Sequence, residues 1–145
     1  MKVRAMQQTD IDTVVDIEQT NYYEPWTKQI FIDCLKVDYQ CLILEEQGEV
    51  LGYAILMQVL DEYHLLNIAI KKAQQNHGLG YFLLQTIIEK AKNNQGKHVF
   101  LEVRASNQAA RHVYKKLGFV EVGVRKDYYS APIGREDAVL YTLDI

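Results

Sequence analysis

The sequence has few of the residues that mark disordered, fibrous or disulfide-linked proteins. Its 145 residues include only two prolines, two cysteines and eight glycines. Proline and glycine are too scarce for a linker-rich or disordered chain, and Cys34 and Cys41 alone cannot form a disulfide framework. The chain is long enough to bury a core of its own. No repeat or change in composition divides it, so we expect a single domain over residues 1–145.

An excess of charge of one sign is also missing. The 16 lysines and arginines and the 19 aspartates and glutamates give a net charge of −3, whereas a nucleic-acid-binding domain normally has a basic surface. We therefore expect no direct binding of nucleic acid. The first residues lack the apolar stretch of a signal peptide, and no run approaches the roughly 18 apolar residues of a membrane span. These absences predict a cytoplasmic protein with no membrane partner.

Clusters of metal ligands are lacking as well. The four histidines, His64, His77, His98 and His112, stand singly, without the spacing of zinc ligands. We therefore predict no metal ion, and we interpret the two cysteines as buried thiols in a reducing compartment.

The hydrophobic pattern predicts strands and helices along the whole chain. Thr9, with Asp12 three residues later, is typical of a capping box at the start of a first helix, and Glu18 continues the apolar stripe of that helix. Helices are also expected over 28–37, 78–93 and 107–117, and strands over 2–6, 39–46, 49–59, 63–70, 99–104, 119–126 and 136–144. This order predicts an α/β (α+β) fold with a mixed sheet that has helices on both faces.

A pair of glycines stands where a strand is expected to give way to a helix. The segment from Gln75 to Gly80 reads Q-x-x-G-x-G. A helix start exposes unpaired backbone N–H groups and a partial positive charge, and glycines there let phosphate oxygens come close. The spacing differs from G-x-G-x-x-G and G-x-x-x-x-G-K-S/T, which disfavours a kinase or GTPase. Taken alone, the pair is also compatible with a purely structural role.

A carboxylate lies inside a strand that is otherwise suited to the core. Alternation places Val99, Leu101 and Val103 on one face and Glu102 on the other. A buried carboxylate costs free energy unless it is solvated or paired. Glu102 is therefore either exposed or ion-paired with Arg104, or it is a general base at the mouth of a cleft, where it could act through water.

The helix that follows this strand has a tyrosine on the same face as its expected cap. Asn107 is a suitable N-cap, and Tyr114 lies seven residues further along, at helical spacing. Tyr114 either packs in the core or directs its hydroxyl into a cleft. A hydroxyl with a pKa near 10 could protonate a thiolate with a pKa near 8.5.

These three segments, in this order, resemble the GCN5-related N-acetyltransferase (GNAT) superfamily. The chain is further similar, along almost all of its length, to the ribosomal-protein-alanine N-acetyltransferases of the RimI type. The segments that carry this resemblance are Ile17-Glu18-Gln19, Pro25-Trp26, Asp61-Glu62, Asn67-Ile68-Ala69-Ile70, Gln75 to Gly80, Leu101 to Asn107, Tyr114, Leu117-Gly118-Phe119, Tyr128-Tyr129 and Gly134-Arg135-Glu136-Asp137-Ala138.

The resemblance implies a fold, a co-substrate and a set of site residues. The fold would be a central, mixed, mostly antiparallel sheet of about seven strands flanked by about four helices. The residues implied to bind acetyl-CoA are Ile68, Ala69 and Ile70 for the acetyl and pantetheine arm, Gln75, Asn76, His77, Gly78, Leu79, Gly80 and Tyr81 for the pyrophosphate, and Asn107 for the pantetheine or adenine end. Glu102 would be the general base and Tyr114 the general acid.

The acceptor implied by the resemblance is the N-terminal alanine of the eighteenth protein of the small ribosomal subunit. Its binding residues would come from loops and strand ends, namely Trp26, Asp61, Glu62, Tyr128, Tyr129, Glu136 and Asp137. The alternative is that the two tyrosines pack within a loop and the carboxylates lie in solvated turns. His77 departs from the Arg, Lys or Gln common at its position in this family, and a neutral histidine would give the phosphates less charge.

Three functions remain open from the sequence. The first is N-terminal acetylation of a ribosomal protein by direct transfer from acetyl-CoA. The second keeps the co-substrate and changes the acceptor to a lysine or a small amine. The third is a non-catalytic acyl-CoA-binding module, against which the presence of both Glu102 and Tyr114 argues. Neither cysteine falls in these segments, which disfavours an acyl-cysteine route.

Overall fold

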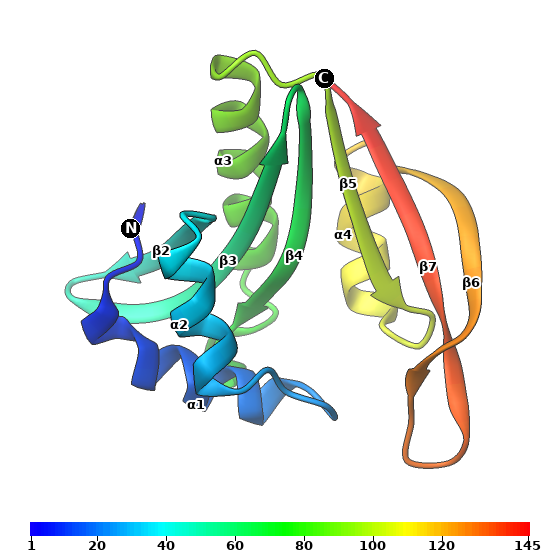
Figure 1. The fold of residues 1–145 in the computed structure, drawn as a ribbon, viewed down its shortest axis with the longest axis horizontal. Coiled ribbons are helices and arrows are strands. Elements are labelled where there is room, and N and C mark those ends of the chain that lie inside the picture. The colour runs from blue at the N-terminus through cyan, green and yellow to red at the C-terminus, as the bar shows by residue number, and fades with distance from the viewer.

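A computed structural model describes all residues from 1 to 145, which form one seven-stranded sheet with helices on both faces (Figure 1). The sheet order is β1-β2-β3-β4-β5-β7-β6. The strands are β1 (Lys2–Ala5), β2 (Gln40–Glu46), β3 (Glu49–Val59), β4 (Glu62–Ile70), β5 (His98–Arg104), β6 (Val120–Ser130) and β7 (Arg135–Asp144), and the helices are α1 (Ile11–Asn21), α2 (Lys28–Lys36), α3 (Leu79–Asn93) and α4 (Gln108–Lys116). The predicted mixed sheet with four helices is confirmed.

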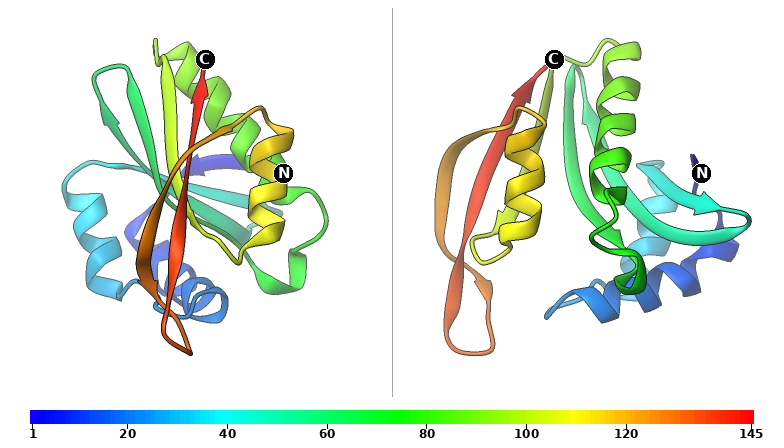
Figure 2. Two further views of the ribbon diagram at one scale, coloured as in Figure 1. Left: turned by 90° about the vertical axis from the view of Figure 1, so that its right-hand side faces the viewer. Right: turned by 180° about the vertical axis from the view of Figure 1, so that it is seen from behind.

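Two apolar cores hold the helices to the sheet. On one face, Phe31 of α2 and Val14 of α1 pack on Tyr53 and Ile55 of β3, and all four side chains are fully buried. On the other face, α3 and α4 cover residues that include Val99, Leu101 and Val103 of β5, as the alternation in the sequence predicts. Figure 2 shows α3 and α4 together when the molecule is seen from behind. No helix has both the length and the apolar character that a membrane crossing requires.

The sheet is antiparallel except between its two central strands. β4 and β5 run parallel, and their paired residues end at Leu65 and Leu101. Beyond these residues, β4 continues to Ile70 and β5 to Arg104 without pairing with each other. The two strands diverge there in Figure 1. The second half of β4 therefore has a strand partner on one edge only, which leaves backbone groups free for a ligand.

The start of the first helix differs from the prediction. Thr9 is not the N-cap, because residues Gln8–Asp10 form a short 3-10 turn before α1. The carboxylate of Asp10 instead accepts from the Gln7 amide at 2.8 Å and from both terminal nitrogens of Arg4, at 2.8 and 2.9 Å. The Arg4 guanidinium holds the pKa of Asp10 below its ordinary value. The capping residues are therefore Gln7 and Asp10 rather than Thr9 and Asp12, and the ion pair with Arg4, six residues before Asp10, holds this start in place.

The strand β3 contains a glycine whose position admits no side chain. A Cβ on Gly52 would lie 2.6 Å from the carbonyl oxygen of Ala69 and 2.7 Å from Cδ1 of Ile70, on the neighbouring strand β4. We expect Gly52→Ala to lower the free energy of unfolding by about 1–3 kcal/mol, because the backbone of β4 must shift. Thermal denaturation measures this. Gly123→Ala, also in a strand but with open space around the added Cβ, is the control and should leave the melting temperature nearly unchanged.

Candidate active site

The unpaired edge of β4 presents backbone groups toward β5. The Lys71 amide donates to Leu51 of β3 at 2.7 Å, so the alternate residues Ile68 and Ile70 direct their N–H and C=O groups to the opposite edge. No strand pairs with that edge beyond Leu65. The amides of Ile68 and Ile70 can therefore hydrogen-bond an extended ligand that lies between β4 and β5.

The carbonyls on the same edge already accept hydrogen bonds from Tyr22, just after α1, and from Gln75, in the loop between β4 and α3. The Tyr22 hydroxyl donates to the Ile68 carbonyl. The side-chain amide of Gln75 donates to the Ile70 carbonyl at 3.0 Å and also to the side-chain oxygen of Asn21. These bonds connect the end of α1 to the loop between β4 and α3. They hold both segments against the unpaired edge of β4.

The predicted phosphate loop leads directly into α3. Gly78 is the N-cap of the helix and has a φ of +78°, a left-handed conformation that favours glycine. It has no side chain to cap the first turn, so the amides that follow it are free to bind an anion. A Cβ at Gly80 would meet only Cγ1 of Ile70, at 3.9 Å. His77 is exposed. The loop thus offers backbone amides rather than side-chain charge to a pyrophosphate, which fits the group that acetyl-CoA carries there.

Glu102 lies on the face of the sheet opposite α3 and α4, at the end of β5 that is no longer paired with β4. Its side chain is 31% exposed, and its Oε1 is 3.2 Å from Nε of Arg125 on β6. The ion pair with Arg104 that the sequence left open is not formed, because Arg104 binds Glu136 at 2.9 Å. Glu102 is thus solvated on one side and paired on the other, so it can remain an accessible carboxylate.

The ring of Tyr114 packs in the core between α4 and the sheet. Its centroid is 5.8 Å from those of Phe119 and Tyr141, and the residue is 5% exposed. The hydroxyl has no hydrogen-bond partner in the chain. Its oxygen is not fully buried, because the one fully buried side-chain polar atom without a partner is the hydroxyl oxygen of Tyr63. Burial raises the pKa of the Tyr114 hydroxyl, with a further contribution from Tyr129. The hydroxyl therefore keeps its proton at neutral pH, and no group of the chain accepts a hydrogen bond from it.

Burial raises the pKa values of three tyrosines, Tyr22, Tyr114 and Tyr129. Tyr22, which directly follows α1, donates its hydroxyl to the Ile68 carbonyl, and Tyr114 contributes, after burial, to raising its pKa. The pKa of Tyr129 is raised to about 12, and the charge of Glu102 adds to the shift. The candidate site is therefore the space beside the unpaired edge of β4, where Tyr22 meets Ile68.

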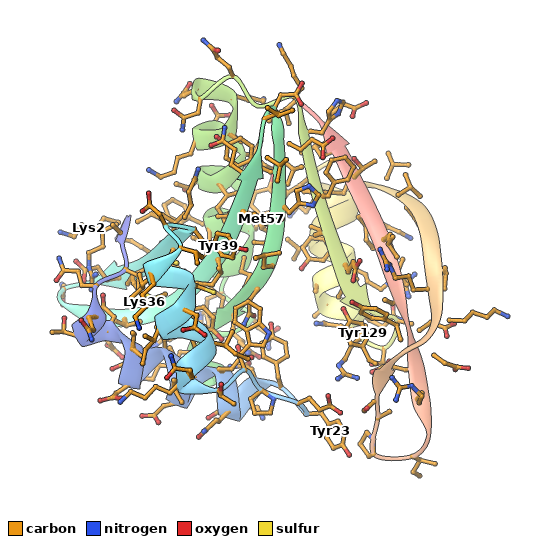
Figure 3. All side chains as sticks on the ribbon, viewed as in Figure 1. Lys2, Tyr23, Lys36, Tyr39, Met57 and Tyr129 are labelled. Atoms are coloured by element: carbon orange, nitrogen blue, oxygen red, sulfur yellow. The ribbon has the colours of Figure 1, made fainter.

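Two segments border the open side of this space. The first is the loop between α1 and α2, and the second is the β6–β7 hairpin; Figure 3 shows Tyr23 of the loop extending toward the hairpin that carries Tyr129. The loop is fixed by Glu18, whose buried carboxylate accepts from the Trp26 amide at 2.9 Å and from Asn67 at 2.8 Å. The Tyr53 hydroxyl also donates to Glu18. These bonds explain a carboxylate within the apolar stripe of α1.

The structure does not bring all predicted acceptor residues together. Asp61 and Glu62 lie at the closed end of the β3–β4 hairpin, where Glu62 pairs with His98. At about 3.3 Å per residue, Glu62 is roughly 26 Å along the strand from Ile70. Glu136 is occupied by Arg104 and by the Ser106 amide at 3.2 Å. The remaining candidates, Trp26, Tyr128, Tyr129 and Asp137, lie in the two bordering segments.

Asn107 is the N-cap of α4, as predicted, and its side-chain oxygen accepts from the Ala110 amide at 3.1 Å. This bond leaves the amide nitrogen of the side chain and one lone pair of its oxygen for a ligand. Sequence reasoning gave no role to Tyr22, Asn67 or Arg125. Asn67 offered one signal, because it is a polar residue in a mainly apolar strand, while nothing local marked Tyr22 or Arg125.

Comparisons with known proteins show which family the chain resembles. Residues 11–119 match the family model described as the acetyltransferase (GNAT) family. The chain is 36% identical to the [ribosomal protein bS18]-alanine N-acetyltransferase of Escherichia coli K12, over 99% of this chain and 97% of that protein. It is 38% identical to the enzyme of that name from Haemophilus influenzae, over 90% of each.

Solved structures give the same result. The ribosomal-protein-S18-alanine N-acetyltransferase from Escherichia coli superposes with a TM-score of 0.94, at 36% identity and over 99% of this chain and 93% of that one. Ard1 from Thermoplasma volcanium superposes with a TM-score of 0.90 over 99% and 97% of the two chains, at 24% identity. The second comparison concerns the fold alone.

Proposed function

The chain belongs to the GNAT family of acetyltransferases, and from that membership we propose that it acetylates the N-terminal alanine of ribosomal protein bS18. Acetyl-CoA would be the co-substrate, as in the family. The observation that carries this acceptor is the similarity, over nearly the full length, to enzymes named for bS18-alanine acetylation.

The residues beside β4 would hold the co-substrate in an extended form. The amides of Ile68 and Ile70 would bind the pantetheine arm, because they face the side of β4 that lacks a strand. The amides from Gly78 to Tyr81, at the start of α3, would bind the pyrophosphate. The side chain of Gln75 would brace the loop through Asn21 and Ile70 rather than touch the phosphates.

Glu102 would take the proton that the acceptor amine loses, directly or through one water. An α-amine has a pKa near 8, compared with about 10.4 for lysine, so a single carboxylate suffices more easily for the α-amine. The thioester supplies the activated acetyl group, and the amine nitrogen forms the new bond to its carbonyl carbon as the bond from carbon to sulfur breaks. Tyr114 would give its proton to the departing thiolate, because its hydroxyl makes no hydrogen bond within the chain.

A covalent acyl-cysteine route is disfavoured by the state of the two thiols. Cys34 and Cys41 are both buried, each with 6% exposure, in the core beneath α1 and α2. Burial raises the pKa of Cys41 to about 12, so it remains a thiol, whereas the thiolate is the nucleophilic form. Direct transfer to the amine therefore fits the chain better.

A competition between two peptides tests the proposal. Purified protein is incubated with acetyl-CoA and equal amounts of two peptides, and the products are weighed by mass spectrometry. One peptide begins with a free alanine followed by basic and aromatic residues; the other has the same sequence with a blocked N-terminus and one internal lysine. We expect acetylation of the first alone. Acetylation of the second would assign the enzyme to lysine or general amine acceptors, and no transfer would contradict the proposed acceptor.

A further inference from the structure

The β6–β7 hairpin contains a wide bulge beside the candidate active site. Arg125 pairs with Ala138 and Tyr129 pairs with Glu136, so residues 126–128 of β6 lie opposite Asp137 alone. Within the bulge, Asp127 has a φ of +52°, a conformation that is uncommon for residues other than glycine. A bulge of this kind changes the direction of side chains within it and next to it. Here these side chains are those of Tyr128 and Tyr129.

Arg135 holds the backbone of this bulge from the opposite strand. Its Nε donates to the Asp127 carbonyl at 2.7 Å and its Nη2 to the Tyr128 carbonyl at 2.9 Å. Its Nη1 lies 3.3 Å from the Ser130 hydroxyl. The carboxylate of Asp137 accepts from the Asp127 amide at 2.9 Å. A planar guanidinium can make several such bonds in a fixed geometry, which a lysine cannot.

The bulge places Tyr129 against residues of the site. The guanidinium of Arg104 lies 4.6 Å from the centre of the Tyr129 ring, and the rings of Tyr128 and Tyr129 are 5.0 Å apart. Arg125, whose Nε is 3.2 Å from Oε1 of Glu102, lies 5.5 Å from the centre of the Tyr128 ring, and the charge of Glu102 contributes, after burial, to raising the pKa of Tyr129 to about 12. The position of Tyr129 relative to Glu102 thus depends on how the bulge is held.

We propose that Arg135 is a positioning residue for the acceptor, acting through the bulge and Tyr129. This inference rests on the proposed function, since it assumes an acceptor that enters between the α1–α2 loop and the hairpin. Arg135 is exposed and belongs to neither apolar core, so its bonds serve the shape of the hairpin rather than the packing of the protein. Loss of contacts that hold the acceptor equally in the ground state and the transition state raises KM and leaves kcat nearly unchanged.

The test compares Arg135→Ala with Arg135→Lys and with Lys126→Ala. Lys126 is exposed in the same bulge and makes no side-chain hydrogen bond or ion pair, so it is the matched control. We expect Arg135→Ala to raise the KM for the alanine peptide about tenfold with a much smaller change in kcat. The lysine variant should be intermediate, because one donor remains. Lys126→Ala should behave as the wild type.

Binding measurements separate positioning from a general structural role. We expect Arg135→Ala to keep the melting temperature and the Kd for acetyl-CoA of the wild type, while a CoA–alanine-peptide conjugate binds about tenfold more weakly. An unchanged affinity for the conjugate, or an equal loss for acetyl-CoA, would overturn the inference. If the wild type acetylates only the lysine peptide, the proposed acceptor fails, and the same variants with that peptide still test Arg135.

Discussion

Glu102→Gln is expected to lower the rate of acetyl transfer roughly 100-fold, the lower end of the range for loss of a general base. Glutamine has nearly the same shape as glutamate but cannot accept a proton from the amine. Binding of acetyl-CoA should persist, because its contacts lie on β4 and α3, whereas Glu102 lies on β5 and pairs with Arg125. Steady-state kinetics with the alanine peptide and calorimetric titration with acetyl-CoA measure the two effects.

Glu121→Gln is a matched control for this variant. Glu121 is also a strand carboxylate beside an arginine, since its Oε2 lies 4.0 Å from Nη2 of Arg111, but it is outside the space that Glu102 faces. The control should retain the wild-type rate. Transfer by Glu102→Gln within about threefold of the wild type would remove Glu102 from the mechanism, because a general base contributes 100-fold or more.

Tyr114→Phe is expected to slow transfer by about 100-fold, the lower end of the range for a general acid, with little change in stability or acetyl-CoA affinity. The ring packs against Phe119 and Tyr141, and phenylalanine preserves this packing. The hydroxyl bonds to no other group in the chain, so its removal leaves no partner unsatisfied. Only the proton for the departing thiolate is lost. Single-turnover rates, melting temperature and the Kd for acetyl-CoA test this.

Tyr141→Phe serves as the control in the same aromatic cluster. The Tyr141 hydroxyl accepts from Nε of Arg111 at 3.0 Å, so its loss should affect stability more than the chemical step. If Tyr114→Phe reduced acetyl-CoA affinity as much as it reduced the rate, Tyr114 would be a packing residue and the thiolate would take its proton from elsewhere.

Much of the fold follows from periodic patterns in the sequence. The alternation of Val99, Leu101 and Val103 identified both β5 and its buried face. Asn107 at the start of α4 is a cap that local chemistry determines. The predicted strand over 119–126 was too short, since β6 runs to Ser130. The bulge interrupts the alternation of β6, and Arg135, at the start of the partner strand β7, stabilises it.

The site was harder to predict where it depends on contacts between distant segments. Arg125 reaches Glu102 from two strands away in the sheet, and Tyr22 bonds a carbonyl 46 residues further along the chain. No local spacing encodes such contacts. Asp61 and Glu62 show another limit of the sequence, because proximity along the chain to β4 does not reveal that they lie at the end of the strand far from Ile70.

A crystal structure of the protein with a CoA–alanine-peptide conjugate tests the central claim most directly. The account predicts the pantetheine arm along Ile68 and Ile70, the pyrophosphate on the amides from Gly78 to Tyr81, the sulfur near the Tyr114 hydroxyl, and the alanine nitrogen facing Glu102. A conjugate bound outside the space between β4 and β5, or one whose alanine nitrogen faces away from Glu102, would contradict the account.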